Sequence, residues 1–367
     1  GSQITELQPF NDAFALLSAF RSGRWSGDVT KNAVDPATGV ISQTVQWSLA
    51  ARLDALPSHT SRVLFTKDAA FTAQGIGSLF SNDATTAARI VDHLRGDRSA
   101  EGFGANGLRP RGSRLGAIVG SAPALNAAKN VAFVAANDGF LHAIDVANGN
   151  ELWAYAPRSA LTAMGQSTQR NWGFRTLHDG KPTVARVTGV TGSGEMLFGG
   201  LGSGGSGWYG LDVSQATSNL DAATRANSLK WELPGADATL AQQMGLAVGK
   251  PLLARTQRFG EVLLLTSGYN AGANDGRGRV FVVDPLTGAV KATLATPQTD
   301  GITSSDPGLA HINTFREVDG NVRHVYGGDE RGNLWRFDLG DANTPPNVNR
   351  LARLTDNTLQ LARLDAP

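Results

Sequence analysis

The glycine-rich segment at residues 200–205 has the spacing that most resembles a site for chemistry in this sequence. Gly200, Gly202 and Gly205 fit the pattern G-x-G-x-x-G, in which backbone N–H groups hold the phosphates of a dinucleotide. That chemistry needs a helix directly behind the glycines, because the helix N-terminus attracts the pyrophosphate. Residues 208–212, Trp-Tyr-Gly-Leu-Asp, have the composition of a strand instead. We therefore interpret the glycines as a closely packed turn and expect no nucleotide cofactor.

Histidines are the next candidates, as metal ligands or general bases. The six residues show no metal-ligand spacing; they are His59, His93, His142, His178, His311 and His324. We expect His142 to point out of the strand that also holds Phe140 and Ile144, which predicts a hydrogen bond to solvent or to a neighbouring blade. The sequence contains no phosphate-loop lysine motif, no G-x-S-x-G, no H-E-x-x-H and no Cys. We therefore predict no catalytic residues and no bound cofactor.

Two charged segments complete the candidates. Residues 109–114, Arg-Pro-Arg-Gly-Ser-Arg, form the densest basic cluster, and we interpret it as a solvated loop that pairs with nearby carboxylates. Arg95-Gly96-Asp97 would be an integrin-type tripeptide if exposed, because the glycine splays the arginine and the carboxylate apart. The tripeptide also ends a predicted helix, where Gly96 is a natural C-terminal cap. Arg95, Gly96 and Asp97 are therefore candidate partner-binding residues, with the cap as the competing interpretation.

Composition narrows the class of protein that must position these residues. The chain has 367 residues, of which 44 are Gly, with 33 Lys and Arg against 32 Asp and Glu, a formal charge of +1. This balance disfavours nucleic acid or an anionic membrane as the main partner. No apolar run approaches the length that crosses a bilayer, so we expect no direct membrane insertion. The glycine content indicates many turns between short strands.

Hydrophobic periodicity predicts helices at 9–20, 45–56 and 82–95, the last capped by Asn82 or Asp83. From about residue 115 the pattern changes to short strands. The predicted strands are Val131–Ala136, Phe140–Asp145, Met196–Gly200, Trp208–Val213, Glu261–Thr266, Val280–Asp284, His324–Gly328 and Leu334–Leu339. Trp153, Trp208, Trp231 and Trp335 lie at strand positions, which predicts packing between sheets rather than on a ligand.

One unit recurs, a glycine followed by an apolar strand that ends in aspartate. Its copies are Gly139–Asp145, Gly207–Asp212, Gly278–Asp284 and Gly332–Asp338. The aspartates are 67, 72 and 54 residues apart, which is wider than a minimal propeller blade and requires insertions or divergent blades. The repeat predicts an all-β, irregular β-propeller of about seven blades with helical and loop insertions.

The expected domain boundaries follow from these patterns. Residues 1–2, Gly-Ser, read as an expression-tag remnant, and residues 3–24 as a helical lead-in. The propeller is expected over residues 25–340, with helical insertions near 45–95. Residues 341–367 are expected to be a C-terminal extension.

Longer segments resemble a known family. The repeats are similar to those of quinoprotein-type propellers, and the specific segments, in order, resemble the C-terminal propeller of the PilC/PilY family of type IV pilus tip proteins. These segments are Leu94–Asp97, Arg111–Pro123, Ala135–Asp145, Glu151–Pro157, Gly199–Gly205, Tyr209–Asp212, Ser267–Asn270 and Tyr326–Leu339, with Trp25–Asp28 as the opening strand.

The resemblance implies a non-enzymatic, exported protein that passes through the periplasm to the pilus tip, cell surface or outer membrane. It implies pilus extension with minor pilins as partners, and attachment to surfaces or to a host-cell receptor such as an integrin, the role proposed for the tripeptide in some members. A scaffold role in outer-membrane assembly and a quinoprotein dehydrogenase are the alternatives. Such dehydrogenases need a calcium and cofactor pocket, often beside a cysteine pair. The dehydrogenase is disfavoured because this sequence has no Cys and no clustered acidic ligands that would form such a pocket.

The resemblance also implies a calcium loop just before Tyr326. This sequence has Phe315, Glu317, Asp319 and Arg323 where oxygen ligands are expected. Only Glu317 and Asp319 are suitable, and the Arg323 cation would repel a dication. We therefore expect no calcium at this degenerate loop, and predict that Arg323 pairs with Glu317 or Asp319 instead.

Overall fold

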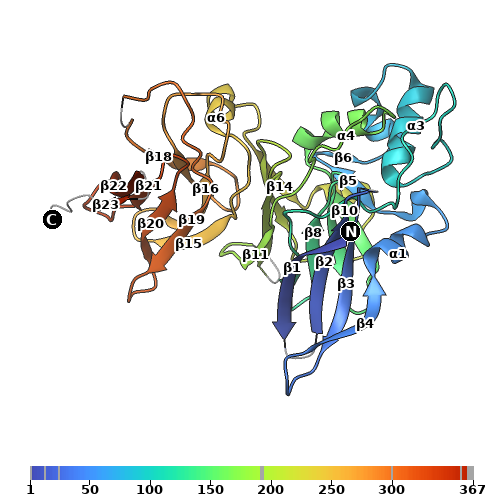
Figure 1. Ribbon diagram of the computed structural model, residues 1–367, viewed down its shortest axis with the longest axis horizontal. Coiled ribbons are helices and arrows are strands. Elements are labelled where there is room, and N and C mark those ends of the chain that lie inside the picture. The colour runs from blue at the N-terminus through green and yellow to red at the C-terminus, as the bar shows by residue number, and fades with distance from the viewer. Residues whose placement is uncertain are drawn as a thin grey trace. The chain divides into compact units, whose positions relative to one another are not determined.

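The computed structural model describes residues 2–11, 14–23, 25–190, 194–298, 301–355 and 358–361. Within these ranges the chain forms five β-sheets (Figure 1). The chain divides into two compact units. The first comprises Gly1–Val184, Leu201–Gly205 and Asp212–Leu229, and the second comprises Ala185–Gly200, Ser206–Leu211 and Lys230–Pro367.

The first unit contains two sheets. The first sheet has the order β1 (Ser2–Asn11), β2 (Phe14–Arg21), β3 (Ser26–Val34) and β4 (Ile41–Ser48). The second has the order β6 (Ala69–Ala70), β5 (Leu64–Thr66), β10 (Glu151–Tyr155), β9 (Leu141–Asp145), β8 (Val131–Ala135) and β7 (Ala124–Asn126). Its strands β7 to β10 form an antiparallel meander, to which β5 adds a parallel edge beside β10.

Three further sheets follow in chain order. The third consists of β11 (Thr183–Arg186), β12 (Glu195–Gly200), β13 (Trp208–Asp212) and β14 (Leu229–Leu233). The fourth consists of β15 (Leu252–Thr256), β16 (Gly260–Thr266), β17 (Arg279–Val283) and β18 (Val290–Ala295). The fifth consists of β19 (Ile312–Arg316), β20 (Val322–Gly328), β21 (Asn333–Asp338), β22 (Asn347–Thr355) and β23 (Thr358–Leu361). The strand segments predicted between residues 131 and 339 are all confirmed to within two residues.

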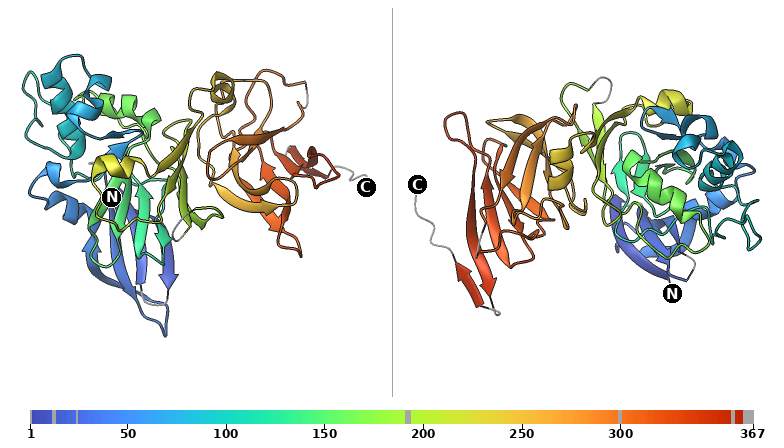
Figure 2. Two further views of the ribbon diagram at one scale, coloured as in Figure 1. Left: turned by 180° about the vertical axis from the view of Figure 1, so that it is seen from behind. Right: turned by 90° about the horizontal axis from the view of Figure 1, so that it is seen from above.

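Short helices interrupt the sheets. They are α1 (Leu49–Asp54), η1 (His59–Ser61), α2 (Ala73–Ile76), η2 (Gly77–Leu79), α3 (Ala84–Arg95), η3 (Arg158–Ala160), α4 (Leu161–Ser167), α5 (Ala222–Ala226) and α6 (Ala238–Gln243). The predicted helix at 82–95 is confirmed as α3. The Asp83 side chain accepts a hydrogen bond from Thr86 N at 2.7 Å, and Gly96 ends the helix in a left-handed conformation with φ +117°. In the first unit, α3 and α4 lie together at one end of the second sheet (Figures 1 and 2).

Two expectations about the ends of the chain are wrong. The predicted helix at 9–20, and with it the helical lead-in, is the hairpin of β1 and β2. In β2, Leu16 and Ser18 are fully buried at a spacing of two, and pairing with both β1 and β3 outweighs local helix propensity. The expected C-terminal extension contains β22 and β23, which pair with β21 and β22 respectively and belong to the fifth sheet. The helix predicted at 45–56 is only partly correct, because the first part of this segment belongs to β4 and the second part to α1.

Each copy of the recurring Gly…Asp unit is the third strand of a four-stranded meander. The four aspartates have the same role. Each accepts, through Oδ1, a hydrogen bond from the N–H of the residue two places on, and this bond closes the following turn. The pairs are Asp145–Ala147 (2.9 Å), Asp212–Ser214 (3.0 Å), Asp284–Leu286 (3.0 Å) and Asp338–Gly340 (2.8 Å). One sheet therefore corresponds to one repeat. The described residues form five sheets rather than about seven blades, because loops and helices fill the wide spacings.

Three tryptophans at the ends of meanders bind the turns that these aspartates close. Trp47 Nε1 donates to Val146 O (2.9 Å), Trp153 Nε1 to Ala216 O (3.0 Å) and Trp231 Nε1 to Pro285 O (2.9 Å). This confirms the prediction for Trp153 and Trp231, whereas Trp47 lay in a segment expected to be helical. Trp335 also packs between sheets as predicted, in one buried cluster with Val262 and Leu264 of the fourth sheet, but its Nε1 donates to Asp329 Oδ2, just after β20, at 2.8 Å. Trp208 is buried, and its Nε1 has no acceptor among the described residues.

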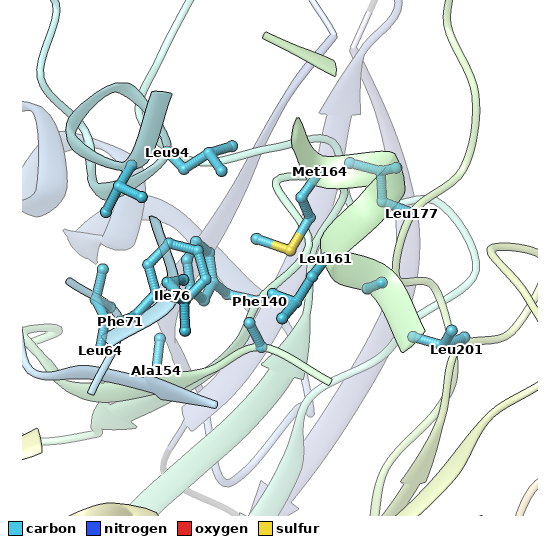
Figure 3. Packing of buried hydrophobic residues seen from close by; sticks show 13 residues of the cluster. Leu64, Phe71, Ile76, Leu94, Phe140, Ala154, Leu161, Met164, Leu177 and Leu201 are labelled. Atoms are coloured by element: carbon cyan, nitrogen blue, oxygen red, sulfur yellow. The ribbon is translucent and has the colours of Figure 1, made fainter. Parts of the chain in front are cut away.

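A hydrophobic core joins the helices to the second sheet. Phe71 and Phe140 pack edge to face with ring centroids 5.0 Å apart, and Leu161 and Met164 of α4 lie nearby (Figure 3). Gly139 is required here, because a Cβ atom would lie 2.5 Å from Met164 Sδ. This packing fixes the helix ends that border the candidate site.

Candidate functional site

The Arg-Gly-Asp tripeptide lies at the C-terminus of α3, and its arginine is turned inward. The Arg95 side chain is 7% exposed, and it donates to Phe71 O at 2.6 Å and to Arg62 O at 3.0 Å. Gly96 N–H donates to the carbonyls at the end of α3, which confirms the cap interpretation. Asp97 is half-buried and accepts from Ser99 N (3.0 Å) and Ser99 Oγ (2.6 Å). In this geometry Arg95 is not presented to a partner.

The basic segment at 109–114 binds the carbonyl ends of helices. Arg114 NH1 donates to Leu53 O at 2.7 Å, beside the end of α1, and Arg111 NH1 donates to His93 O at 2.6 Å in the last turn of α3. Arg109 Nε donates to Ser167 O at 2.7 Å, the last residue of α4. Helix C-termini carry partial negative charge and unsatisfied carbonyls, so each arginine stabilises a different helix. The expected carboxylate pairing holds for Arg111, but the loop is half-buried rather than fully solvated.

Glu101 is the carboxylate that pairs with this segment. Its Oε1 lies 2.8 Å from Arg111 Nε, and its Oε2 lies 3.3 Å from Arg98 Nε. Burial alone would raise the pKa of Glu101, but the hydrogen bonds and charge of Arg111 outweigh burial and hold that pKa below its ordinary value. One carboxylate therefore sits among several guanidinium groups.

A buried cluster of four charged side chains lies in the second sheet and the segment before β5. Glu151 binds Arg62 through both oxygens (2.7 and 2.8 Å) and His142 Nδ1 at 2.7 Å, and Asp138 lies 3.2 Å from His142 Nε2. Burial would lower the pKa of His142, but the two carboxylates raise it to about 9. Burial would raise the pKa of Glu151, but Arg62 and His142 hold it at about 2. His142 makes hydrogen bonds as predicted, but both predicted partners, solvent and a neighbouring blade, are wrong, because Glu151 lies in its own sheet and Asp138 in the turn before β9.

A groove of about 620 Å³ opens beside the basic segment. Trp25 and Trp172 line it together with Arg98, Arg109, Arg111 and Arg170. A smaller cavity of about 30 Å³ shares both tryptophans with the groove and reaches Asp138. Sequence reasoning missed this site, because its residues come from four segments that share no spacing.

The glycine-rich turn and the degenerate calcium loop lie elsewhere. A Cβ at Gly202 would lie 2.6 Å from Gly180 N, and β13 rather than a helix follows, so the close-packed turn is confirmed. Residues 317–321 form the turn between β19 and β20, where Asp319 Oδ2 accepts from Asn321 Nδ2 at 2.7 Å and from Gln257 Nε2 at 2.9 Å.

The predicted partner of Arg323 is wrong. Its Nε lies 3.2 Å from Asp338 Oδ1 and its NH1 lies 3.3 Å from Asp341 Oδ2, because the register of β20 with β21 places Asp338 beside it. Glu317 instead lies 3.7 Å from His324 Nδ1, and Phe315 is 70% exposed. A cation held by two aspartates beside the turn does not fit a calcium site.

Within the described part of the chain, no group of three or more His, Cys, Asp or Glu side chains is placed to hold a metal ion. No helix in these residues has the length and hydropathy to cross a membrane.

Comparisons with known proteins point to one family. The family model described as the PilY1 beta-propeller domain matches residues 105–356. The type IV pilus biogenesis factor PilY1 homolog of Xylella fastidiosa is 30% identical over 362 residues, covering 90% of this chain and 27% of that protein. The type IV pilus biogenesis factor PilY1 of Pseudomonas aeruginosa is 29% identical over 377 residues, covering 89% of this chain and 31% of that protein. The chain thus spans less than a third of the length of these relatives.

Solved structures give similar matches. The P. aeruginosa PilY1 C-terminal domain is 29% identical with a TM-score of 0.44, covering 57% of this chain and 39% of that chain. BamB from Moraxella catarrhalis is 14% identical with a TM-score of 0.38, covering 94% of this chain and 62% of that chain.

Proposed function

The chain belongs to the PilY1 β-propeller family of type IV pilus biogenesis factors, and on that premise we propose that it is a non-enzymatic domain for pilus assembly and tip adhesion. It promotes pilus extension together with minor pilins and mediates attachment to a surface or a host cell. The protein that contains it is exported through the periplasm and acts at the pilus tip, the cell surface or the outer membrane.

The observation that carries this proposal is the extent of the family match. Residues 105–356 include the meander β7 to β10 and the strands β11 to β22, together with the four Asp-closed turns. A match of this extent covers the architecture rather than a single motif. It therefore supports the family's role more strongly than the repeats alone, which many unrelated propellers share.

The chemistry of the described residues supports a binding role rather than catalysis. The groups with large pKa shifts, such as His142 and Glu151, pair with one another inside the second sheet. Mutual pairing of this kind is typical of a structural ion-pair network, which shifts pKa values without any catalytic role. We therefore expect function to reside on the loops and grooves outside the sheets.

A deletion strain tests the proposal. Surface pili are counted by shearing and electron microscopy in a strain lacking the parent gene, and host-cell attachment is measured in parallel. Loss of pili, restored by the gene in trans, would support the assembly role, whereas normal pili with lost attachment would support the adhesin role alone. Normal pili together with normal attachment would contradict both roles and favour a scaffold in outer-membrane assembly.

A further inference from the structure

The groove of the first unit combines two kinds of side chain that recognition sites use. Four of its lining residues are arginines and two are tryptophans, and no aspartate or glutamate is among the described lining residues. Glu101 is the neighbouring carboxylate, and it already binds Arg111 and Arg98. The groove therefore keeps an excess of positive charge although the whole chain is nearly neutral.

Two of the four lining arginines, Arg109 and Arg170, are oriented by the protein and keep donors for a ligand, whereas Arg111 uses all three of its nitrogens on Glu101, His93 O and Asp97 O. Arg109 uses Nε on Ser167 O, and its guanidinium lies 5.6 Å from the centre of the Trp25 ring. Arg170 is exposed and uses NH1 on Phe103 O. For both side chains, the remaining guanidinium nitrogens have no acceptor among the residues that the structure describes. A guanidinium held by one hydrogen bond is pre-organised to bind an anion with its other donors.

The aromatic rings supply flat apolar surface beside this charge. Trp25 packs against Phe174 with centroids 5.7 Å apart, and the Arg175 guanidinium lies 5.2 Å from the centre of the Trp172 ring. Both tryptophans are half-buried, so part of each ring faces solvent. Phe103, whose backbone carbonyl accepts from Arg170 NH1, is 85% exposed and is not among the described lining residues of the groove. Rings fixed in this way offer stacking surface at low cost in conformational entropy.

We propose that this groove binds an acidic saccharide, with the carboxylate on the arginines and the sugar faces on the tryptophans. Pyranose rings have apolar C–H faces that stack on indole, and their hydroxyl groups accept hydrogen bonds from guanidinium. None of the described residues that line the groove is Leu, Ile, Val or Met, so this lining offers no aliphatic pocket for an acyl chain or an apolar peptide side chain. Its volume of about 620 Å³ is within the range of small-molecule sites. The inference rests on the proposed attachment role, for which it names the ligand class.

Binding by the purified 367-residue chain tests the inference. Trigalacturonate is the probe, and its methyl ester, which keeps the rings and loses the charge, is the matched ligand control. Arg170→Gln is the test variant and Arg52→Gln the matched protein control, since Arg52 is also exposed, also donates one hydrogen bond to a backbone carbonyl (Asn148 O, 3.1 Å), and lies outside the lining. Calorimetry should show that trigalacturonate binds, that the ester binds about tenfold more weakly or worse, and that Arg170→Gln but not Arg52→Gln weakens binding to a similar extent.

Several results would overturn the inference. These are no binding of trigalacturonate at millimolar concentration, equal binding of the acid and the ester, or equal effects of the two substitutions. A pentaglutamate peptide that binds as tightly as trigalacturonate would show that the groove recognises charge alone, which would also overturn the saccharide assignment. Because this assay uses purified protein, its failure is distinct from failure of the proposed function, which is measured by pili and attachment in cells.

Discussion

The guanidinium of Arg95 uses its hydrogen bonds on backbone carbonyls of the neighbouring Phe71 and Arg62. An integrin-type contact would require this buried side chain to leave those acceptors unpaired, which is costly in free energy. At the residue scale, the tripeptide therefore works as a helix end. The carboxylate of Asp97 is the part that a partner could still approach.

Asp97→Glu tests the partner-binding role of the tripeptide. The substitution keeps the charge and lengthens the side chain by one methylene, which would impair recognition by an integrin that needs the carboxylate at a fixed reach. We expect attachment to integrin-bearing cells to be unchanged, with a stability loss of at most about 1 kcal/mol from the weakened contact with Ser99. Lost attachment with normal pili and a normal melting temperature would instead establish the integrin role.

The candidate site could be predicted only in part. The sequence identified the helix end at Gly96 and the arginines at 109–114, because Gly caps and basic runs are local signals. It did not identify the groove, because no local signal connects Trp25 or Trp172 to those arginines. Of the two partners of His142, Glu151 is nine residues away, and only the pairing of β9 with β10 brings it close to the imidazole.

At the scale of elements, the contact between a tryptophan and an Asp-closed turn links one sheet to the next. Gly149 ends one such turn with φ +77°, and a Cβ there would lie 2.5 Å from Trp47 Cδ2. Gly39 is the matched control, since it has φ +70° and nothing within 4 Å of its Cβ position. Gly39→Ala should therefore show only the cost of the left-handed backbone, about 1–2 kcal/mol. Gly149→Ala should cost about 2 kcal/mol more, because it also displaces the tryptophan.

Urea denaturation of both variants measures this difference in the free energy of unfolding. Near-ultraviolet circular dichroism of the folded variants would report displacement of the indole ring. Equal losses in the two variants would show that the tryptophan contact contributes little to stability.

The turn between β19 and β20 carries a second prediction at this scale. Adding millimolar calcium in place of chelator should leave the melting temperature unchanged, because the Arg323 cation is held by Asp338 and Asp341 beside the turn. Differential scanning fluorimetry measures this. A calcium-dependent rise that disappears in Asp319→Ala would show that the turn binds the ion after all.

Arg323→Ala should lower the free energy of unfolding by about 1 kcal/mol or less, since the ion pair of Arg323 with Asp338 is partly exposed.

Strands and helices could be predicted from the sequence where the hydrophobic pattern and the turn or cap residues at its ends indicate the same element. β8 and β17 are short apolar runs bounded by turn residues, and α3 has a cap at each end. β2 was mistaken for a helix because Phe10, Phe14 and Leu17 follow a helical spacing, and only its pairing with β1 and β3 reveals the strand. β22 was missed because its asparagines have low strand propensity, and β21 supplies the pairing that orders it.

At the scale of the whole molecule, the net charge does not show how the charged side chains are distributed over the structure. A formal charge of +1 predicts no long-range attraction to anions. The fold nevertheless places arginines at the C-terminal carbonyls of helices and around one groove. The groove can therefore recognise a small acidic ligand at short range, while the molecule as a whole lacks the field that would draw in nucleic acid.

Folding stability should have a maximum near pH 6.5, which is the ordinary pKa of histidine. The pKa of His142 is raised to about 9, so the folded chain holds a proton that the unfolded chain loses between pH 6.5 and 9. The free energy of unfolding should therefore fall as pH rises through this window, by on the order of 3 kcal/mol. Burial lowers the pKa values of His93 and His178 to about 4, so only the unfolded chain takes up these protons between pH 6.5 and 4.

Stability should therefore also fall on the acid side of the maximum. Asp28 and Asp179, whose pKa values burial raises, oppose part of that loss, because protonation of these carboxyls favours the folded state. Urea denaturation from pH 4 to 9 measures the curve, and the ¹H–¹³C resonances of His142 report its pKa directly. Constant stability from pH 6.5 to 9 would mean that His142 is neutral when folded. A neutral imidazole has a single N–H, so His142 could then donate to Asp138 or to Glu151 but not to both, and the fall in stability above pH 6.5 would have no source in this cluster.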